Sequence, residues 1–391
     1  SPTKNIAPTT VWVIWWVGMA YVSALVGNLW ALINPWAVLF SWAEVLYGRL
    51  RPGRPYGAGL PYPARLGAWP AVALFLGFAW MEIVSERGDD PTSLATAITV
   101  YSVITWAGMV AFGRETWLRH GEAFAVVFGL LARFAPTEAG TGSGRDGSPR
   151  WRLRPPGVGL LTAEPVAPAM IGFVLLMLAT VTFDGFIETP AWKALLDGIA
   201  TSPALRSFLL WLLAIGVPDL LVVIKTVALV VFPLLFAAAF LLFSNWMAVA
   251  GEGVVPTGRI AGFFVLSLVP IAIAYHLAHY LSFLLLAGQL MIPLVSDPFG
   301  FGWDLFGTAA YALDISVINA KFAWYVSVTA IVTGHVFAVY LAHVTAFRVF
   351  DDPWIALKSQ VPMLVLMVGY TMISLWILAQ PVVSDAGLGV G

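Results

Sequence analysis

The chain has 391 residues, of which 60% are hydrophobic and 10% charged, whereas soluble domains average about half apolar and about a quarter charged residues. This composition excludes an ordinary soluble enzyme. The 20 Lys and Arg residues against 21 Asp and Glu give a net charge of −1, which leaves no basic excess for binding nucleic acid. The absence of cysteine excludes disulfides, thiolate metal sites and cysteine nucleophiles.

Aromatic residues are abundant, with 18 Trp, 25 Phe and 11 Tyr. Tryptophan and tyrosine are enriched where amphipathic rings lie at the headgroup level of a bilayer. Together with the low charge content, they indicate a polytopic membrane protein whose first partner is the lipid bilayer.

Membrane-spanning segments follow from the length of the apolar windows, because a helix needs roughly 20 apolar residues to cross the hydrocarbon core while satisfying its own backbone groups. Eight windows meet this requirement, at approximately 11–33, 67–84, 93–112, 167–184, 219–248, 259–289, 321–347 and 355–380. The sequence therefore predicts an all-α fold, a polytopic transmembrane helical bundle with about eight spans.

Three further segments are apolar without being obvious spans. Residues 34–50 carry four aromatic residues around a single Glu44, and residues 116–134 alternate aromatic with charged side chains. Such patterns are typical of helices that lie in the interface plane. Residues 203–216 are too short to cross before Pro218 and are interpreted as a re-entrant half-helix. If this segment crosses instead, the orientation of every later span is inverted.

Arginine-rich loops set the orientation, since short basic loops stay cytoplasmic. Four arginines lie between residues 49 and 65 and seven between residues 114 and 154. Eight alternating spans then place 14 basic residues inside against five outside, with both termini facing outward. We expect a multi-pass protein of the bacterial inner (cytoplasmic) membrane.

A composition change near residue 136 suggests how the chain is divided. Residues 136–156 are mostly Gly, Ser, Pro and Arg and offer little to bury. We therefore expect an N-terminal membrane half over 1–135, a cytoplasmic linker over 136–165 and a C-terminal membrane half over 166–391.

Histidines concentrate in the C-terminal half. Four of the five, His276, His279, His335 and His343, fall in two consecutive predicted spans, whereas His120 lies apart. At about 1.5 Å per residue, His276 lies roughly 20 Å and His279 roughly 15 Å below the outer end of their span, with His335 roughly 21 Å and His343 roughly 33 Å deep in the next. The first three are expected to meet near mid-membrane, with His343 near the cytoplasmic edge.

Three converging imidazoles are a donor set for a transition metal with an open position, and an opposed pair such as His276 and His335 suits axial ligation of haem. The candidate metal ligands are His276, His279, His335 and His343. Haem or copper is favoured over zinc. A proton or substrate relay and plain hydrogen bonds between helices are the alternatives, and packing is the preferred interpretation of His120 and of His343 taken alone.

Other polar groups are expected at membrane depth. They are Asp184, Asp219, Lys225 and Asp314. Asp219 and Lys225 do not form a local pair, and each is predicted to face another span, although Asp219 follows Pro218 at a helix start, where capping is the simpler role. The Gly- and Pro-rich loop over 291–310 joins the two histidine spans on the outer face. It is interpreted as a lid over the histidine site, as a docking surface for a periplasmic partner, or as a plain interfacial loop.

Common enzyme motifs are missing: the sequence has no Walker loop, no GxSxG elbow and no HExxH. Four stretches, at residues 34–36, 275–280, 296–300 and 334–343, resemble those of a family of bacterial multi-span proteins labelled fenitrothion hydrolase-like. The resemblance implies cleavage of an organophosphate ester. A metal-activated water at the histidines would supply the nucleophile, although no carboxylate base is visible beside them.

Three functions follow from these observations, and whether the protein is an enzyme stays open. The first is a redox or electron-transfer subunit that binds haem or copper through His276 and His335, with other membrane or periplasmic subunits as partners. The second is a cofactor-free transporter or scaffold subunit of a membrane complex whose histidines carry protons or join helices. The third is a metal-dependent organophosphate hydrolase.

Overall fold

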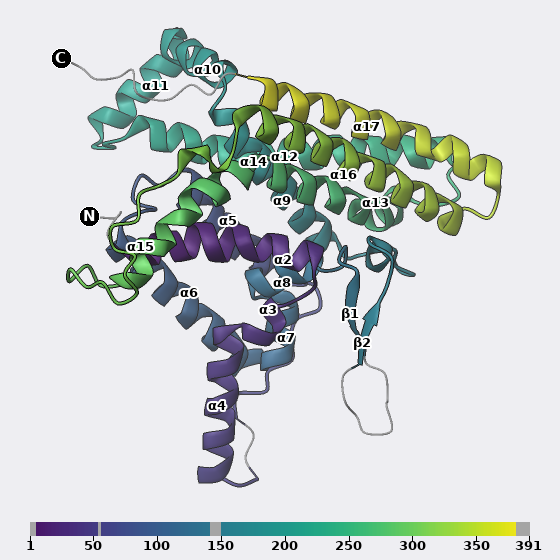
Figure 1. Cartoon of the computed structure of the whole chain (residues 1–391). Helices are drawn as coiled ribbons and strands as arrows, with labels where there is room; N and C mark the ends of the chain where they lie inside the picture. Colours follow the sequence, from purple (N-terminus) through teal and green to yellow (C-terminus); the bar gives the residue numbers. More distant parts are fainter. Residues whose placement is uncertain (1–4, 54–55, 141–149, 381–391) are drawn as a thin grey trace.

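The computed structural model describes residues 5–53, 56–140 and 150–380, and over these residues it is a bundle of helices with one small hairpin (Figure 1). The predicted all-α polytopic bundle is confirmed. The N-terminal part contains the elements α1 (Ile6–Pro8), the π-helix η2 (Thr9–Gly18), α2 (Met19–Leu25), α3 (Trp30–Ile33), α4 (Pro35–Leu50), α5 (Trp69–Ile83), α6 (Pro91–Phe112), α7 (Arg114–His120), α8 (Ala123–Leu131) and the strands β1 (Thr137–Gly140) and β2 (Arg150–Leu153).

The rest of the chain is helical. It contains η3 (Val158–Leu160), α9 (Pro168–Ile187), α10 (Pro190–Thr201), α11 (Pro203–Ala214), α12 (Leu220–Ala250), α13 (Thr257–Phe264), η4 (Val265–Leu268), α14 (Val269–Ala287), η5 (Gly288–Leu290), α15 (Met291–Ser296), η6 (Ile315–Val317), α16 (Ala320–Val349) and α17 (Pro353–Ala379). Proline occupies the first turn of α4, α5, α6, α9, α10, α11, α14 and α17, where its missing N–H costs no hydrogen bond.

Seven helical stretches within the described residues are long and apolar enough to cross a membrane, so the chain is a multi-pass membrane protein. They match seven of the eight predicted windows, although the first ends at Leu25 rather than near residue 33. The eighth window is occupied by α5, whose 15 residues fall short of a full crossing. The predicted re-entrant segment is the 12-residue helix α11.

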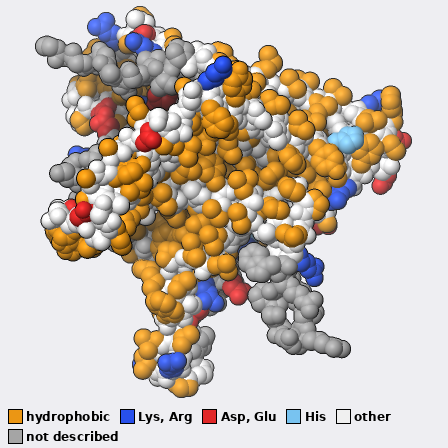
Figure 2. All heavy atoms as spheres, viewed as in Figure 1, with side chains coloured by type: hydrophobic (Ala, Val, Ile, Leu, Met, Phe, Trp, Pro, Cys, Tyr) orange, Lys and Arg blue, Asp and Glu red, His pale blue; other side chains and the backbone are white. Residues whose placement is uncertain are grey.

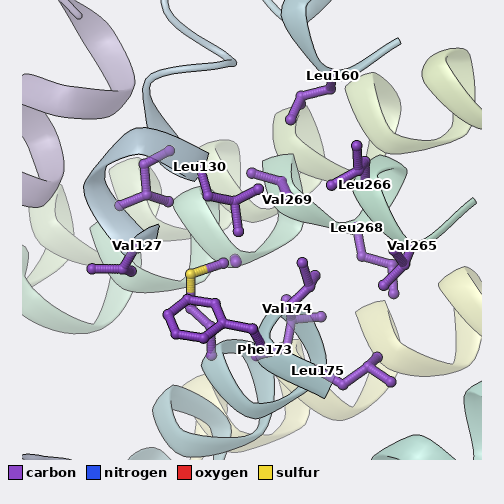
Figure 3. Packing of buried hydrophobic residues seen from close by; sticks show 14 of the residues in the cluster. Val127, Leu130, Leu160, Phe173, Val174, Leu175, Val265, Leu266, Leu268 and Val269 are labelled. Carbon is purple, nitrogen blue, oxygen red and sulfur yellow. The ribbon is translucent and has the colours of Figure 1, made fainter. Parts of the chain in front are cut away.

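The most buried stretch is the run from α13 through α15, over Thr257–Ser296. Its central helix, α14, packs against α16, α9 and η2. Figure 3 shows side chains of α8, α9 and η4 interdigitating with the start of α14, among them Val127, Phe173, Leu266 and Val269. One hydrophobic core therefore draws on both predicted halves of the chain, and α14 lies at its centre.

The predicted interfacial segment 116–134 and the predicted linker 136–165 differ in detail from what the sequence suggested. The second half of the predicted interfacial segment 116–134 is the helix α8, whose residues are almost all buried in the core. The predicted linker contains a hairpin, in which Thr137 pairs with Leu153 and Glu138 with Arg152. Residues 141–149 of that linker lie outside the described residues. The division into two membrane halves stays a prediction.

The surface seen in Figure 2 is mainly hydrophobic over the middle of the molecule, and most charged side chains gather toward its ends and on its projections. Two elements leave the body in Figure 1: α4, which projects across the direction of α16 and α17, and the β1–β2 hairpin. The crosswise direction of α4 fits the interfacial helix expected over 34–50, because such a helix lies parallel to the membrane plane.

A buried carboxylate anchors the N-terminal part. Glu122 is fully buried and caps α8 by accepting hydrogen bonds from the Phe124 and Ala125 N–H groups at 2.9 and 2.7 Å. The Glu122 oxygens also accept hydrogen bonds from the Asn34 amide at 3.0 Å, from the Trp30 indole at 3.4 Å and from the Tyr101 hydroxyl. This one side chain therefore ties α3, α6 and α8 together, which explains why α8 lies in the core.

We expect Glu122→Ala to lower the free energy of unfolding by about 3 kcal/mol, because it removes a helix cap and leaves several buried donors without an acceptor. The matched control is Glu44→Ala, which removes a partly exposed ion pair with Arg114 at 3.2 Å and is expected to cost less than about 1 kcal/mol. Thermal or denaturant unfolding in detergent measures both. Equal effects of the two substitutions would contradict the anchoring role of Glu122.

Candidate functional site

Of the histidines in the predicted spans, His276 and His279 share a neighbour, because the Tyr280 ring centroid lies 4.7 Å from both of their rings. His276 faces η2 and α2, with ring centroids 5.7 Å from Trp16 and 5.6 Å from Tyr21. His279 faces Asp184 of α9. His335 lies toward α17, with its ring centroid 6.1 Å from that of Tyr370.

The remaining two histidines have local partners. The His343 ring nitrogen Nδ1 lies 2.8 Å from the side-chain oxygen of Gln360. His120 Nδ1 lies 3.0 Å from the Thr116 carbonyl oxygen, and its ring stacks on Tyr62. Both arrangements agree with the packing role preferred for these two residues.

Within the described ranges, no three His, Asp or Glu side chains are grouped so that they could hold a metal ion. The reason lies in the helix geometry. His279 and Tyr280 of α14 face Asp184 of α9, whereas His335 of α16 faces Tyr370 of α17. The helices α14 and α16 approach closely at Gly334, where a Cβ would lie 2.4 Å from that of Ala274. The proposal of haem or copper at His276 and His335, or of a metal at the four histidines, gains no support from these contacts and stays a prediction.

Two imidazoles nevertheless have a buried nitrogen without a partner. His276 is 8% exposed and His335 7% exposed, and the Nε2 of each makes no hydrogen bond among the described residues. The Nδ1 of His335 lies 2.7 Å from the Ile331 carbonyl oxygen, so it carries the hydrogen and leaves Nε2 as an acceptor. His276 lines a cavity of about 20 Å³ beside Tyr21, a size that suits a single water.

A polar cluster lies next to these histidines and is formed by Glu82, Asp184, His279 and Tyr280. The Tyr280 Oη lies 3.1 Å from Glu82 Oε1 and 2.9 Å from Asp184 Oδ2. The same Asp184 oxygen lies 2.8 Å from His279 Nε2. Four ionisable side chains from α5, α9 and α14 therefore form one continuous hydrogen-bonded chain, which we call the Glu82–His279 chain.

The hydrogens in this chain can be counted. The single hydroxyl hydrogen of Tyr280 cannot be donated to two carboxylates at once, so the second short contact requires a proton on one carboxyl group. Asp184 is hydrogen-bonded to the His279 ring, and the Lys225 ammonium lies within electrostatic reach of it. No Lys or Arg nitrogen of the described chain lies within 4 Å of Glu82. The proton therefore belongs on Glu82, which donates to Tyr280 while Tyr280 donates to Asp184.

The position of the chain along the bundle follows from the helix ends. Glu82 is the second-last residue of α5, and Asp184 lies three residues before the end of α9. Lys225 is in the second turn of α12, about 8 Å from its first residue at 1.5 Å per residue. The Glu82–His279 chain thus lies close to one end of the bundle, the end that the arginine distribution predicts to face outward.

A second set of hydroxyl and imidazole groups continues inward from His279. The His279 ring stacks on Tyr275 with centroids 6.3 Å apart, and Tyr275 lies within electrostatic reach of Tyr370. The Tyr370 hydroxyl lies 2.6 Å from Thr182 Oγ1, and its ring faces His335. These residues connect the Glu82–His279 chain to the middle of the 30-residue helix α16.

The remaining polar groups singled out from the sequence have ordinary structural roles. Asp219 caps α12 by accepting from the Val222 N–H at 3.0 Å, as expected. Asp314 is exposed in the loop before α16, outside the spans, and the Ser316 side-chain and backbone donors hold its pKa below the usual value.

The loop over 291–310 is held in shape by its own polar groups. Asp297 accepts from the Phe301 and Gly302 N–H groups, and Ser296 Oγ lies 2.7 Å from Thr308 Oγ1. The loop presents exposed Phe299 and Phe301 side chains. Its roles as a lid or as a docking surface stay predictions.

Sequence reasoning named Asp184, His279 and Lys225 but missed Glu82 and the role of Tyr280. A signal for Glu82 was present, because it is an acidic residue inside an apolar window, and such residues usually face the bundle interior. The pairing itself required the packing of α5 and α9 on α14, which periodicity within single helices does not give.

Comparisons of the chain with protein-family models, with curated proteins and with solved structures found no match. The resemblance to fenitrothion hydrolase-like proteins therefore stays a prediction.

Gly185 keeps the junction between His279 and Tyr275 open. A Cβ at this position would lie 2.7 Å from the Tyr275 hydroxyl and 3.1 Å from Ile377. We expect Gly185→Ala to destabilise the protein by about 1–3 kcal/mol through overpacking. Gly198→Ala in α10 is the control, since nothing lies within 4 Å of its added methyl group, and helix propensity favours alanine. Unfolding midpoints of the two variants test this, and an undiminished midpoint in Gly185→Ala would contradict it.

The haem and copper hypothesis has a direct test in one purified preparation. If His276 and His335 hold haem or copper, the protein shows a Soret band or stoichiometric metal in elemental analysis, and His276→Ala removes it while His120→Ala does not. A preparation from cells supplied with iron, copper and haem precursors that carries neither would end this hypothesis.

Proposed function

We propose that this protein translocates protons within the membrane, with the Glu82–His279 chain as the relay. The observation that carries the proposal is the Tyr280 hydroxyl placed between two carboxyl groups, one of which also pairs with His279. Ionisable groups at membrane depth are costly, and chains of Asp, Glu and His are characteristic of proton pathways in pumps and transporters. This is the transporter alternative among the functions that the sequence suggested.

The first step of the relay is a paired transfer. Glu82 gives its proton to Tyr280 Oη while the Tyr280 hydroxyl hydrogen passes to Asp184 Oδ2. The phenol is unchanged, and the negative charge has moved from Asp184 to Glu82. The short distances on both sides of Tyr280 allow the two transfers to take place without any helix movement.

The second step follows from the loss of charge on Asp184. A protonated His279 is stabilised by the Asp184 carboxylate at 2.8 Å, since an opposite charge at this distance favours the charged form. When Asp184 receives a proton, this stabilisation ends, and the Nδ1 proton of His279 passes by way of the Tyr275 and Tyr370 hydroxyl groups to His335 Nε2, an acceptor without a hydrogen-bond partner among the described residues. His279 Nδ1 lies on the Gly185 and Tyr275 side of the ring, toward Tyr370 and His335. Glu82 then regains a proton from the outer solution, which restores the starting number of protons.

The relay is tested in proteoliposomes that contain a pH-sensitive dye, with a potassium gradient and valinomycin as the driving force. We expect Glu82→Gln and Asp184→Asn to lower the proton flux by about 100-fold, the scale associated with loss of a positioned proton-transfer group. Asp219→Asn is the matched control at the same end of the bundle, because asparagine caps a helix as well as aspartate does. Its flux should equal that of the unchanged protein.

Tyr280→Phe separates relay from packing, since it keeps the ring and removes only the hydroxyl. A folded, monodisperse Tyr280→Phe protein that conducts at full rate would contradict the relay. Wild-type flux no greater than that of protein-free vesicles would overturn the proposed function.

A further inference from the structure

A second cavity lies at the opposite end of the bundle and has no connection with the Glu82–His279 chain. It has a volume of about 220 Å³, and its lining includes Thr162, Phe263, Thr345 and Arg348. Arg348 is in the last turn of α16, and Phe263 is at the end of α13. The cavity is therefore formed where α13, α16 and the segment after η3 meet.

The polar groups of this cavity have unused hydrogen-bonding capacity. Thr345 lines the cavity and is 8% exposed as a whole residue. Arg348 forms no ion pair with any described carboxylate. A second cation, Arg259, lies 5.9 Å from the centroid of the ring of Phe263, a residue that lines the cavity.

Acidic residues occur nearby in the sequence, at Glu164 and Asp351, but neither lies within 4 Å of an arginine nitrogen at the cavity. Asp352 is engaged as the cap of α17. The cavity thus offers an unpaired guanidinium, a threonine hydroxyl and an apolar wall. Planar guanidinium groups bind phosphate oxygens through paired hydrogen bonds.

We propose that this cavity binds a phosphate monoanion or diester, with Arg348 and Thr345 holding its oxygens and Arg259 adding long-range attraction. An anionic phospholipid headgroup is one source of this group, since basic pockets between transmembrane helices bind such headgroups. Free inorganic phosphate is the other source. The apolar wall at Phe263 and Val349 provides contact for an acyl chain, which free phosphate lacks.

The test measures the thermal unfolding midpoint of the delipidated full-length protein in detergent. Phosphatidylglycerol, phosphatidylcholine and inorganic phosphate are added separately, because a ligand that binds only the folded state raises the midpoint. Phosphatidylglycerol should raise it more than phosphatidylcholine, and most of the difference should be lost in Arg348→Gln. If phosphate alone gives the same rise, the site takes free phosphate, whereas no rise with phosphate assigns it to lipid.

Arg206→Gln is the matched control, because Arg206 is an exposed arginine of α11, outside the cavity, and its substitution should leave the lipid effect intact. Thr345→Val keeps the side-chain shape and should reduce the effect partially, which protects the test against a poorly folded Arg348 variant. Equal stabilisation by both lipids, or an undiminished phosphatidylglycerol effect in Arg348→Gln and Thr345→Val, would overturn the proposal.

Discussion

The structure of the membrane core depends on the burial of ionisable side chains beside α14. A carboxyl group inside a bilayer is tolerated only when it is neutral, paired or hydrogen-bonded. Asp184 and Glu82 meet this condition through Tyr280 and His279. The positions of α5 and α9 against α14 are therefore set by chemistry as well as by apolar packing, since moving either helix would leave a carboxyl group without its partner.

The N-terminal part also buries a carboxyl group, but it stabilises this group in a different way. Glu122 is more deeply buried than either carboxyl group of the relay, yet it accepts from backbone and side-chain donors on all sides. Its hydrogen-bond partners among the described residues include no second carboxyl group and no imidazole with which a proton could be exchanged. The Glu82–His279 chain differs because a single phenol bridges two carboxyl groups, of which only one carries a proton in the proposed relay. Glu122 is thus suited to a structural role and the Glu82–His279 chain to proton transfer.

Much of the architecture could be predicted from the sequence, because a membrane span is specified by local hydrophobicity alone. Seven windows correspond to long helices, and Asp219 caps α12 as its position after Pro218 suggested. The short α5 and the buried α8 were less predictable, since their environment comes from neighbouring helices. The sequence of an apolar helix of nine residues is the same whether the helix lies in the membrane interface or in a protein core, so the sequence alone does not distinguish the two locations.

The site was predictable only in part. The sequence placed His276, His279 and His335 at similar depth, and depth is a property of each helix taken separately. Whether two side chains at one depth face each other depends on helix rotation, which is set here by close contacts such as Gly334 against Ala274. The structure directs His279 toward Asp184 and His335 toward Tyr370. Partners on other helices, Glu82 above all, could not be assigned without this packing.

The two ends of the bundle carry different chemistry. One end holds carboxyl groups, a phenol and an imidazole in mutual contact, and the other holds arginine and threonine side chains around an open cavity. The first arrangement suits mobile protons and the second suits a bound anion. A phosphate bound beside Arg348 would fix the ends of α13 and α16, and α16 carries His335 at its middle.

In the proposed relay, one proton is held on Glu82 and shared through Tyr280 with Asp184. Infrared difference spectroscopy of the purified protein during a pH titration reports protonated carboxyl groups directly. We expect a protonated carboxyl band at neutral pH that disappears in Glu82→Gln and shifts in Tyr280→Phe, where its hydrogen-bond partner is lost. A wild-type spectrum without such a band, or a band unaffected by both substitutions, would contradict the account.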